Sequence, residues 1–183
     1  MSSNYLLSVT PLLNLKQAEK SLAEAVAYAR AFNGTIIIEE VPNWNAFFKK
    51  YVPAAQAVVG NQRILDLRLM PTALFEDEVG QKRILSALEN MLPHAAPYIV
   101  VANPYKLKGK FVGGETAVHP QWYDSLWHLS MGVNWGFNST LDQKSQVYNE
   151  VSTQVVDYLR AVAPNSGAYF VSLTPSFALM TMC

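Results

Sequence analysis

The sequence predicts an α+β fold in which helices pack on one face of an antiparallel sheet and leave the other face open. Residues 125–135 alternate between apolar and polar side chains, which is typical of a strand with one buried face in an antiparallel sheet. Long segments at 15–32, 79–92 and 141–163 repeat apolar residues at helical spacing. Helical and strand segments follow one another in mixed order without an internal repeat, and this order favours helices on a single sheet face.

The first element is expected to be a helix over residues 15–32. Its apolar residues recur every three or four positions, and Asn14 stands where an N-cap side chain accepts the first backbone hydrogen bonds. We expect Asn33-Gly34 to end the helix, because Gly34 accepts the left-handed conformation just beyond a helix without a steric cost.

Two short elements are expected next. Residues 35–41 are rich in β-branched side chains and precede a proline, which predicts a strand. Asn43 can cap a short helix whose aromatic residues begin at Trp44. Pro53 is expected to end that helix, since proline lacks the backbone donor that a helix interior needs.

The middle of the chain predicts a strand, a helix and a second strand. Residues 63–70 alternate, with leucines on one side and Asp66 and Arg68 on the other, which indicates a half-buried strand. Residues 79–92 form an amphipathic helix that a proline ends. The apolar run at 98–102 predicts a buried strand. The expected apolar side of the helix consists of Ile84, Leu85, Leu88, Met91 and Leu92.

The two faces of the strand at 125–135 differ in chemistry. One face carries Trp127, Leu129, Met131, Val133 and Trp135, and the other carries Leu126, His128, Ser130, Gly132 and Asn134. We expect the first face to pack on helices and the second to meet something polar. A long helix over 141–163 and a final strand over 168–171 complete the expected domain.

Composition and charge exclude several classes of function. Half of the 183 residues are hydrophobic, which supplies a packed core. Fourteen basic residues balance fourteen acidic ones without a basic stripe, so nucleic-acid binding through phosphate neutralisation is not expected. The single cysteine, Cys183, excludes an intramolecular disulfide. No apolar run approaches the ~18 residues that span a bilayer, no segment reads as a signal peptide, and the sequence assigns no compartment.

The histidines are the candidate chemical groups, because the sequence has no cluster of metal ligands, phosphate-binding loop or nucleophile elbow. His94 follows a proline at a helix end and is expected to lie at the surface. His119 precedes Pro120 and is expected to be structural. His128 lies on the polar face of the most regular strand, where ligand binding is the alternative to a structural role. The sequence identifies no catalytic residue.

Four segments resemble berberine-bridge-type FAD-linked oxidoreductases. Glu115–Trp122 is similar to the family segment T-x-V-N-P-x-W-R, and Ser125–Leu129 resembles the strand that follows it. Gly167–Tyr169 resembles the motif G-A-Y-x-N-E, and Arg68–Phe75 resembles S-R-L-L-P-x-x-x-F. The segments occur in the order of the family and span about residues 60–170.

The resemblance implies a substrate-binding domain over residues 1–170, with an atypical tail at 171–183. In the family an antiparallel sheet lies over the flavin ring of FAD, so the resemblance implies that its open face contacts a small-molecule substrate, such as a secondary metabolite. The residues that it implies on the substrate side are His128, Ser130, Asn134 and Tyr169. The flavin-binding domain of the family is not in this sequence, and we expect the chain alone not to bind FAD tightly and to be inactive.

Departures from the family pattern leave other functions open. Val171 and Ser172 stand in place of the Asn and Glu of the motif, and Tyr123 stands where the family commonly has Arg. A reading frame truncated by a retained intron would explain the tail. The first alternative is a cofactor-free isomerase or cyclase that uses His128 or His119 as an acid or base. The second is a non-catalytic module that self-associates through its exposed sheet face.

Overall fold

The computed structural model describes residues 6–10, 12–55, 62–101, 109 and 118–168. The chain divides into two compact units, Met1–Val58 and Val59–Cys183. The division falls inside the stretch at 1–170 that we expect to act as one substrate-binding domain, and that expectation stays a prediction.

The first unit begins with two helices where the sequence predicts one. Helix α1 (Leu15–Ser21) and helix α2 (Ala23–Ala31) are separated by Leu22, whose backbone departs from helical geometry. The predicted N-cap is confirmed: Asn14 Oδ1 accepts the N–H of Gln17 at 3.0 Å, and Gln17 Oε1 accepts the N–H of Asn14 at 3.1 Å. This reciprocal pair is a capping box, which satisfies backbone N–H groups that have no partner within the first turn of the helix.

At the end of α2, the residue in the left-handed conformation is not the predicted one. Asn33 has a φ of 55°, so Asn33 rather than Gly34 occupies that region, which asparagine tolerates better than most residues. Position 34 favours glycine because a side chain there would clash with the preceding helix. Its N–H bonds to the carbonyl of Ala29 at 2.7 Å, and a Cβ at this position would lie 2.9 Å from the same oxygen.

The prediction of a strand over residues 35–41 is wrong. This segment has no regular secondary structure and joins no sheet ladder, and a strand without a neighbour leaves its backbone groups without the partners that stabilise it. Side chains hold it instead. Glu39 binds Lys50 at 2.6 Å and also accepts the hydroxyl of Tyr51, and Glu40 accepts the N–H of Leu15 at 3.1 Å.

Helix α3 (Trp44–Ala55) begins as predicted and ends later than predicted. Asn43 Oδ1 accepts the N–H of Ala46 at 3.0 Å, which is the expected cap. Pro53 lies inside the helix rather than after it. Because it lies in the last turn, only one backbone donor is missing near the helix end, and α3 continues past it.

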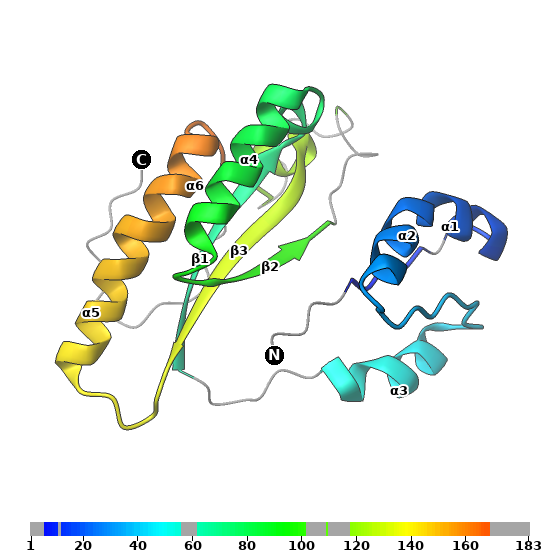
Figure 1. Ribbon diagram of the computed structural model, residues 1–183, viewed down its shortest axis with the longest axis horizontal. Helices are drawn as coiled ribbons and strands as arrows, with labels where there is room; N and C mark the ends of the chain where they lie inside the picture. The colour runs from blue at the N-terminus through cyan, green and yellow to red at the C-terminus, as the bar shows by residue number, and fades with distance from the viewer. Residues whose placement is uncertain (1–5, 11, 56–61, 102–108, 110–117, 169–183) are drawn as a thin grey trace. The chain divides into compact units, whose positions relative to one another are not determined.

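The second unit contains a three-stranded antiparallel sheet in the order β1-β3-β2, with β3 in the centre (Figure 1). The strands are β1 (Gln62–Pro71), β2 (Ala96–Val100) and β3 (Ser125–Trp135). The short 3-10 turn η1 (Thr72–Phe75) follows β1, and η3 (Pro120–Asp124) precedes β3. Strands β1 and β3 therefore confirm the two alternating segments of the sequence.

Strand β2 differs from the prediction of a buried strand at 98–102. It covers Ala96–Val100, and all of its residues except Val100 are exposed. The physical reason is its position: within the described residues, β2 pairs only with β3 and forms an edge of the sheet. An apolar run by itself does not distinguish a central strand from an edge strand.

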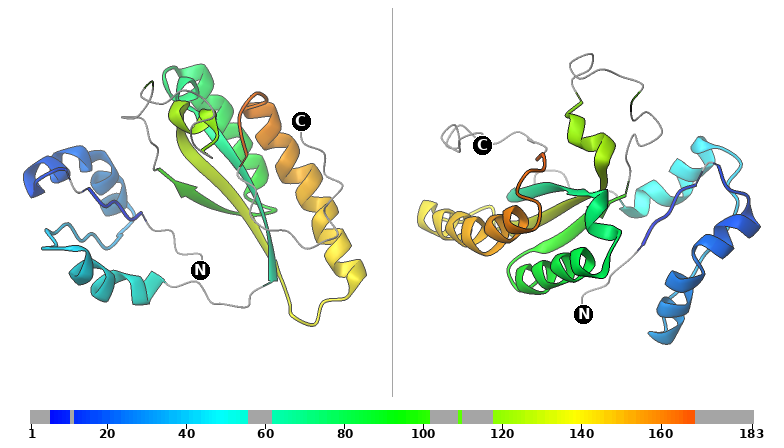
Figure 2. Two further views of the ribbon diagram at one scale, coloured as in Figure 1. Left: turned by 180° about the vertical axis from the view of Figure 1, so that it is seen from behind. Right: turned by 90° about the horizontal axis from the view of Figure 1, so that it is seen from above.

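Helices cover one face of this sheet, as predicted (Figure 2). Helix α4 (Glu78–Met91) lies beside a second, nearly continuous helix made of α5 (Leu141–Val151), the π-helical turn η4 (Ser152–Val156) and α6 (Asp157–Val162). The largest fully buried side chains of this layer are Met70, Met91, Leu129, Met131, Val151, Val155 and Leu159. Leu85 and Leu92 of the predicted apolar side are instead 59% and 52% exposed.

Strands β1 and β3 present opposite chemistry to the helices. Residues directly opposite in an antiparallel pair share a face. The register pairs Asp66 with Met131 and Arg68 with Leu129 on the helical face, and Leu67 with Ser130 and Leu69 with His128 on the open face. The polar side of β1 therefore faces the helices and its leucines face away from them.

The end of the described chain limits two predictions. Ala168 is described and is not part of a strand. The rest of the strand predicted over 168–171, Tyr169 and the tail at 171–183 lie outside the described residues.

Candidate functional site

The open face of the sheet combines a polar central strand with apolar neighbours. We use this term for the face on which the β3 residues Leu126, His128, Ser130, Gly132 and Asn134 lie. Three rows of cross-strand neighbours define it: Leu69–His128–Val100, Leu67–Ser130–Tyr98 and Leu65–Gly132–Ala96. A largely apolar surface with a few polar groups at fixed positions is typical of a small-molecule site.

The described site residues of the sequence analysis lie along one line. His128, Ser130 and Asn134 occur on the same face of β3, while the fourth predicted residue, Tyr169, lies outside the described residues. Their burial differs: Ser130 is 4% exposed, His128 is half-buried and Asn134 is exposed. The line therefore runs from a shielded middle to a solvent-accessible end.

His128 has the environment of a neutral imidazole. Burial lowers the pKa of His128 below its ordinary value of 6.5, because desolvation disfavours the charged ring. The indole ring of Trp122, from η3, meets the imidazole edge to face with ring centroids 5.3 Å apart. At neutral pH this ring therefore offers one hydrogen-bond donor and one acceptor.

His119 is not among the substrate-side residues that the resemblance implies, and the sequence predicts a structural role for it. Its Nδ1 accepts the N–H of Gln121 at 3.2 Å and caps η3, so the expected structural role is present. A Cβ built on Gly167 would lie 2.9 Å from that Nδ1 and 3.3 Å from Cδ1 of Leu69. His119 and Leu69, which stands directly opposite His128, therefore both lie against Gly167; we call the surroundings of Leu69 this corner of the sheet.

The turn after α6 is tied to β1 by a side chain of the helical face and by bonds to the strand backbone. From the helical face, the Arg68 guanidinium donates to the carbonyl of Ala163 at 2.7 and 2.9 Å and to that of Pro164 at 2.8 Å. Along the backbone, Leu69 N–H donates to Gly167 O at 3.0 Å, and Ser166 Oγ donates to Leu69 O at 2.5 Å. These bonds position Gly167 against His119.

Charged groups also lie between the sheet and the helices. Burial raises the pKa of Asp66 to about 6, against the opposing effects of a backbone hydrogen bond at Leu67 and the charges of Arg160 and Arg68. Burial and the charge of Arg160 also lower the pKa of Arg68. This cluster supports the turn after α6 and does not face the open side.

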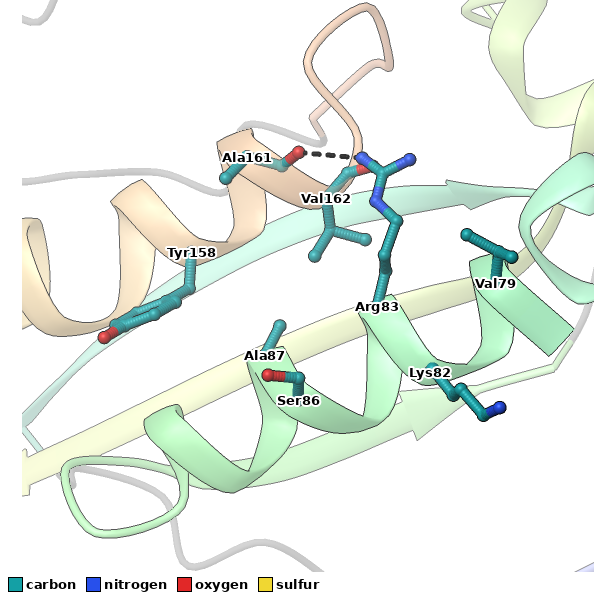
Figure 3. Close-up of a pocket in the computed structure, with 8 residues that line it drawn as sticks. All are labelled: Val79, Lys82, Arg83, Ser86, Ala87, Tyr158, Ala161 and Val162. Carbon is teal, nitrogen blue, oxygen red and sulfur yellow. Dashed lines mark hydrogen bonds between the residues drawn. The ribbon is translucent and has the colours of Figure 1, made fainter.

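A shallow groove lies elsewhere, between α4 and α6 (Figure 3). It encloses about 430 Å³ and is lined by Val79, Lys82, Arg83, Ser86, Ala87, Tyr158, Ala161 and Val162. Arg83 donates to Ala161 O at 3.1 Å and to Val162 O at 3.2 Å, so its charge is used to cap the end of α6. The groove belongs to the helical layer rather than to the predicted site.

The remaining histidine has the surface role expected from the sequence. His94 Nδ1 lies 2.7 Å from Glu150 Oε1 and links the end of α4 to α5. The described residues contain no group of three or more His, Cys, Asp or Glu side chains that would hold a metal ion. None of the described helices is both long and apolar enough to span a membrane.

Comparisons with known proteins point to one class of enzyme. An FAD-linked oxidoreductase (OXR2) of Pyricularia oryzae is 29% identical over 92% of this chain, and a second (cheF) of Chaetomium globosum is 27% identical over 86%. A third (ffsJ), of Aspergillus flavipes, is 27% identical over 87% of this chain. No family profile matches the sequence. The chain thus resembles FAD-linked oxidoreductases, as the sequence segments predict.

The chain covers only part of these relatives. It spans 29%, 26% and 31% of their respective lengths. The VAO-type flavoprotein MtVAO713 of Myceliophthora thermophila shares its fold with a TM-score of 0.68, over 86% of this chain and 28% of the flavoprotein, at 19% identity. The shared fold therefore corresponds to a portion of a larger flavoprotein.

Four of the described helix N-termini do not fit the pyrophosphate of FAD. A dinucleotide is usually held by backbone N–H groups at a helix N-terminus. In this chain, the side chains of Asn14, Asn43, Asp77 and Thr140 occupy the N-termini of α1, α3, α4 and α5. The carboxylate of Asp77 would in addition repel a phosphate. These four helix N-termini therefore offer no free site for the phosphates of FAD.

Proposed function

We propose that this chain forms the substrate-facing wall of a berberine-bridge-type FAD-linked oxidoreductase. The observation that carries the proposal is the line of His128, Ser130 and Asn134 on a sheet face that the helices do not cover. The similarity to FAD-linked oxidoreductases over most of the chain supports it. The proposed substrate is small and largely apolar, such as a secondary metabolite, with few polar atoms.

In this proposal the chain binds and orients, while the cofactor, held by other parts of a complete enzyme, carries the redox chemistry. Leu65 and Tyr98 contact the apolar body of the substrate and exclude water. Ser130, Asn134 and the neutral ring of His128 form hydrogen bonds with its polar atoms. Tyr169 is proposed to face the same chamber.

The wall is tested by mapping where a small aromatic ketone binds. We expect acetophenone in molar excess to shift the backbone amide signals of Tyr98 and Ser130 in NMR spectra of the 183-residue chain. Met131 serves as the control, because it is the next residue of β3 and faces the helices. Shifts confined to the helical face would contradict the proposal.

The chain alone is proposed not to bind FAD tightly and to be inactive, because side chains already cap the N-termini of α1, α3, α4 and α5. The measurement is the visible absorbance of flavin in the purified protein, before and after incubation with FAD and gel filtration. We expect no stoichiometric flavin. A yellow protein that retains one FAD per chain would contradict this part of the proposal.

A truncated reading frame is proposed as the origin of the tail at 171–183. Transcripts that splice after the codon of Phe170 into an exon encoding Asn and Glu would support it. Transcripts that continue to the codon of Cys183 would contradict it.

A second candidate function rests on the two imidazoles at this corner of the sheet. His119 lies against Gly167 beside Leu69, the cross-strand neighbour of His128, and a cofactor-free isomerase or cyclase would use the two imidazoles as acid and base. Its test is the loss of a measured isomerase activity in His128→Ala. A non-catalytic module that self-associates through the open face would instead elute as a defined dimer in size-exclusion chromatography.

A further inference from the structure

The corner around Leu69 brings together residues that are far apart in the sequence. Leu69 of β1 stands opposite His128 of β3, and its N–H bonds to Gly167 O at 3.0 Å. A Cβ at Gly167 would meet both the His119 imidazole and the Leu69 methyl within 3.3 Å. The imidazole of His119 and the side chain of Leu69 therefore both lie against Gly167.

The hydrogen bond at Nδ1 determines which proton the neutral His119 ring carries. A neutral imidazole has one N–H and one acceptor nitrogen. Because Gln121 N–H donates to Nδ1 at 3.2 Å, Nδ1 is the acceptor and the proton resides on Nε2. His119 is exposed, so this Nε2–H is available as a donor to a molecule at the corner.

Glycine at position 167 is what permits this arrangement. A Cβ would lie 2.9 Å from Nδ1 and 3.1 Å from Cε1 of His119, closer than side-chain atoms normally approach. The turn cannot easily retreat, because Arg68 and Ser166 bind it to β1. A methyl group at residue 167 would thus displace the imidazole rather than the turn.

We propose that His119 is a substrate-binding residue that donates its Nε2–H to an oxygen acceptor of the substrate. The substrate class is a largely apolar molecule with a carbonyl, carboxylate or phenolate oxygen, whose apolar part contacts Val100 and Trp122 beside the corner. This inference rests on the proposed function and adds to it the polar group that the substrate carries. Gly167 is a positioning residue in this site.

His119→Asn separates the two roles of the imidazole. The Oδ1 of asparagine lies where Nδ1 lies in histidine, so it still accepts the Gln121 N–H and caps η3. It has no donor at the place of Nε2. We expect the variant to unfold at the same temperature as the wild type but to bind acetophenone about tenfold more weakly, the effect of losing one well-made hydrogen bond.

Gly167→Ala tests the positioning role through a spectroscopic readout. In long-range ¹H–¹⁵N NMR spectra we expect wild-type His119 as the Nε2–H tautomer, and a mixture of tautomers in Gly167→Ala because the Nδ1 bond is lost. His94→Asn is the control for both variants, since His94 pairs with Glu150 between α4 and α5. It should change neither the tautomer of His119 nor the binding of the probe.

The outcomes distinguish this inference from the proposed function. Ethylbenzene, which lacks the oxygen, should bind the wild type and His119→Asn equally. If acetophenone shifts Ser130 and Tyr98 equally in wild type and His119→Asn, the role of His119 is overturned while the substrate wall stands. If wild-type His119 is the Nδ1–H tautomer, its role is likewise overturned. If the probe shifts no residue of the open face, both proposals fail.

Discussion

The helical face and the open face of the sheet receive opposite contributions from neighbouring strands. Strand β3 sends Leu129 and Met131 toward the helices and His128 and Ser130 away from them, whereas β1 sends the charged Asp66 and Arg68 to the helices and its leucines to the open face. The alternation of a single strand therefore does not tell which of its sides is buried under the helices. Register and the partners that each side meets decide it.

The charge of Arg68 on the helical face makes hydrogen bonds, which explains why it is tolerated there. Arg68 binds the carbonyls at the end of α6, so the cost of burying its guanidinium is offset by hydrogen bonds. On the open face Leu67 and Leu69 are buried, and the half-buried Leu65 is the leucine that would contribute to the proposed apolar wall of a small-molecule site. The difference between the faces is thus one of role rather than of polarity.

The largest expected effect comes from the helical face of β3. Met131 is 1% exposed and belongs to the core cluster under the helices. Met131→Ala should lower the free energy of unfolding by about 2–5 kcal/mol, because it leaves a cavity that the layer cannot close. Urea denaturation followed by circular dichroism measures it. A loss below about 1 kcal/mol would mean that this face does not form the core.

The next effect comes from the charge of Asp66 on the same face. Its pKa is raised from 3.8 to about 6 in the folded chain, so the unfolded chain loses the proton first as pH rises. The contribution of Asp66 to the free energy of unfolding should be fully present below pH 3.8 and should be lost as pH rises through about 6. The loss amounts to about 3 kcal/mol, because each tenfold change in the affinity for the proton corresponds to about 1.4 kcal/mol.

Asp66→Asn removes the charge while keeping the shape. The variant should be more stable than the wild type at pH 7.5, by up to about 3 kcal/mol, and equally stable near pH 4. Urea unfolding at the two pH values measures the difference. Glu89→Gln on the exposed side of α4 is the control and should change stability by less than about 0.5 kcal/mol at either pH. Equal effects of Asp66→Asn at both pH values would contradict the burial of this charge.

The smallest effect on stability is expected on the open face. Asn134→Ala should change the free energy of unfolding by less than about 0.5 kcal/mol, because Asn134 is exposed. Val133→Ala is the matched control: the adjacent residue packs against the core and should lose about 1 kcal/mol or more. Thermal unfolding compares the pair. The comparison of the two faces fails if Asn134→Ala destabilises more than Val133→Ala.

The elements that sequence reasoning located well are those whose pattern is repeated many times. Strand β3 begins and ends at the predicted residues 125 and 135, since alternation over a whole strand leaves one register. Local chemistry was equally informative at Asn14 and Asn43, where a side chain caps the helix that follows it. The strand predicted at 35–41 failed because a β-branched run says nothing of whether a pairing strand exists.

Part of the candidate site was visible in the sequence and part was not. His128, Ser130 and Asn134 share a face because a strand alternates with a period of two, and this needed no tertiary information. His119 was expected to be structural and was otherwise named only as a possible acid or base of the isomerase or cyclase alternative, because its neighbours along the chain give no sign of a substrate site. Its approach to Gly167 and Leu69 joins segments about 50 to 100 residues apart.

The amino-acid order by itself determined the periodic elements, the caps and the two chemically distinct sides of β3, because these depend on residues a few positions apart. Only the tertiary structure decided which side of β1 meets the helices, that β2 is an edge strand and that two histidines share a corner. Such features depend on which distant segments pair and in what register, and the free energy of that pairing is spread over the whole sheet and the helices packed against it.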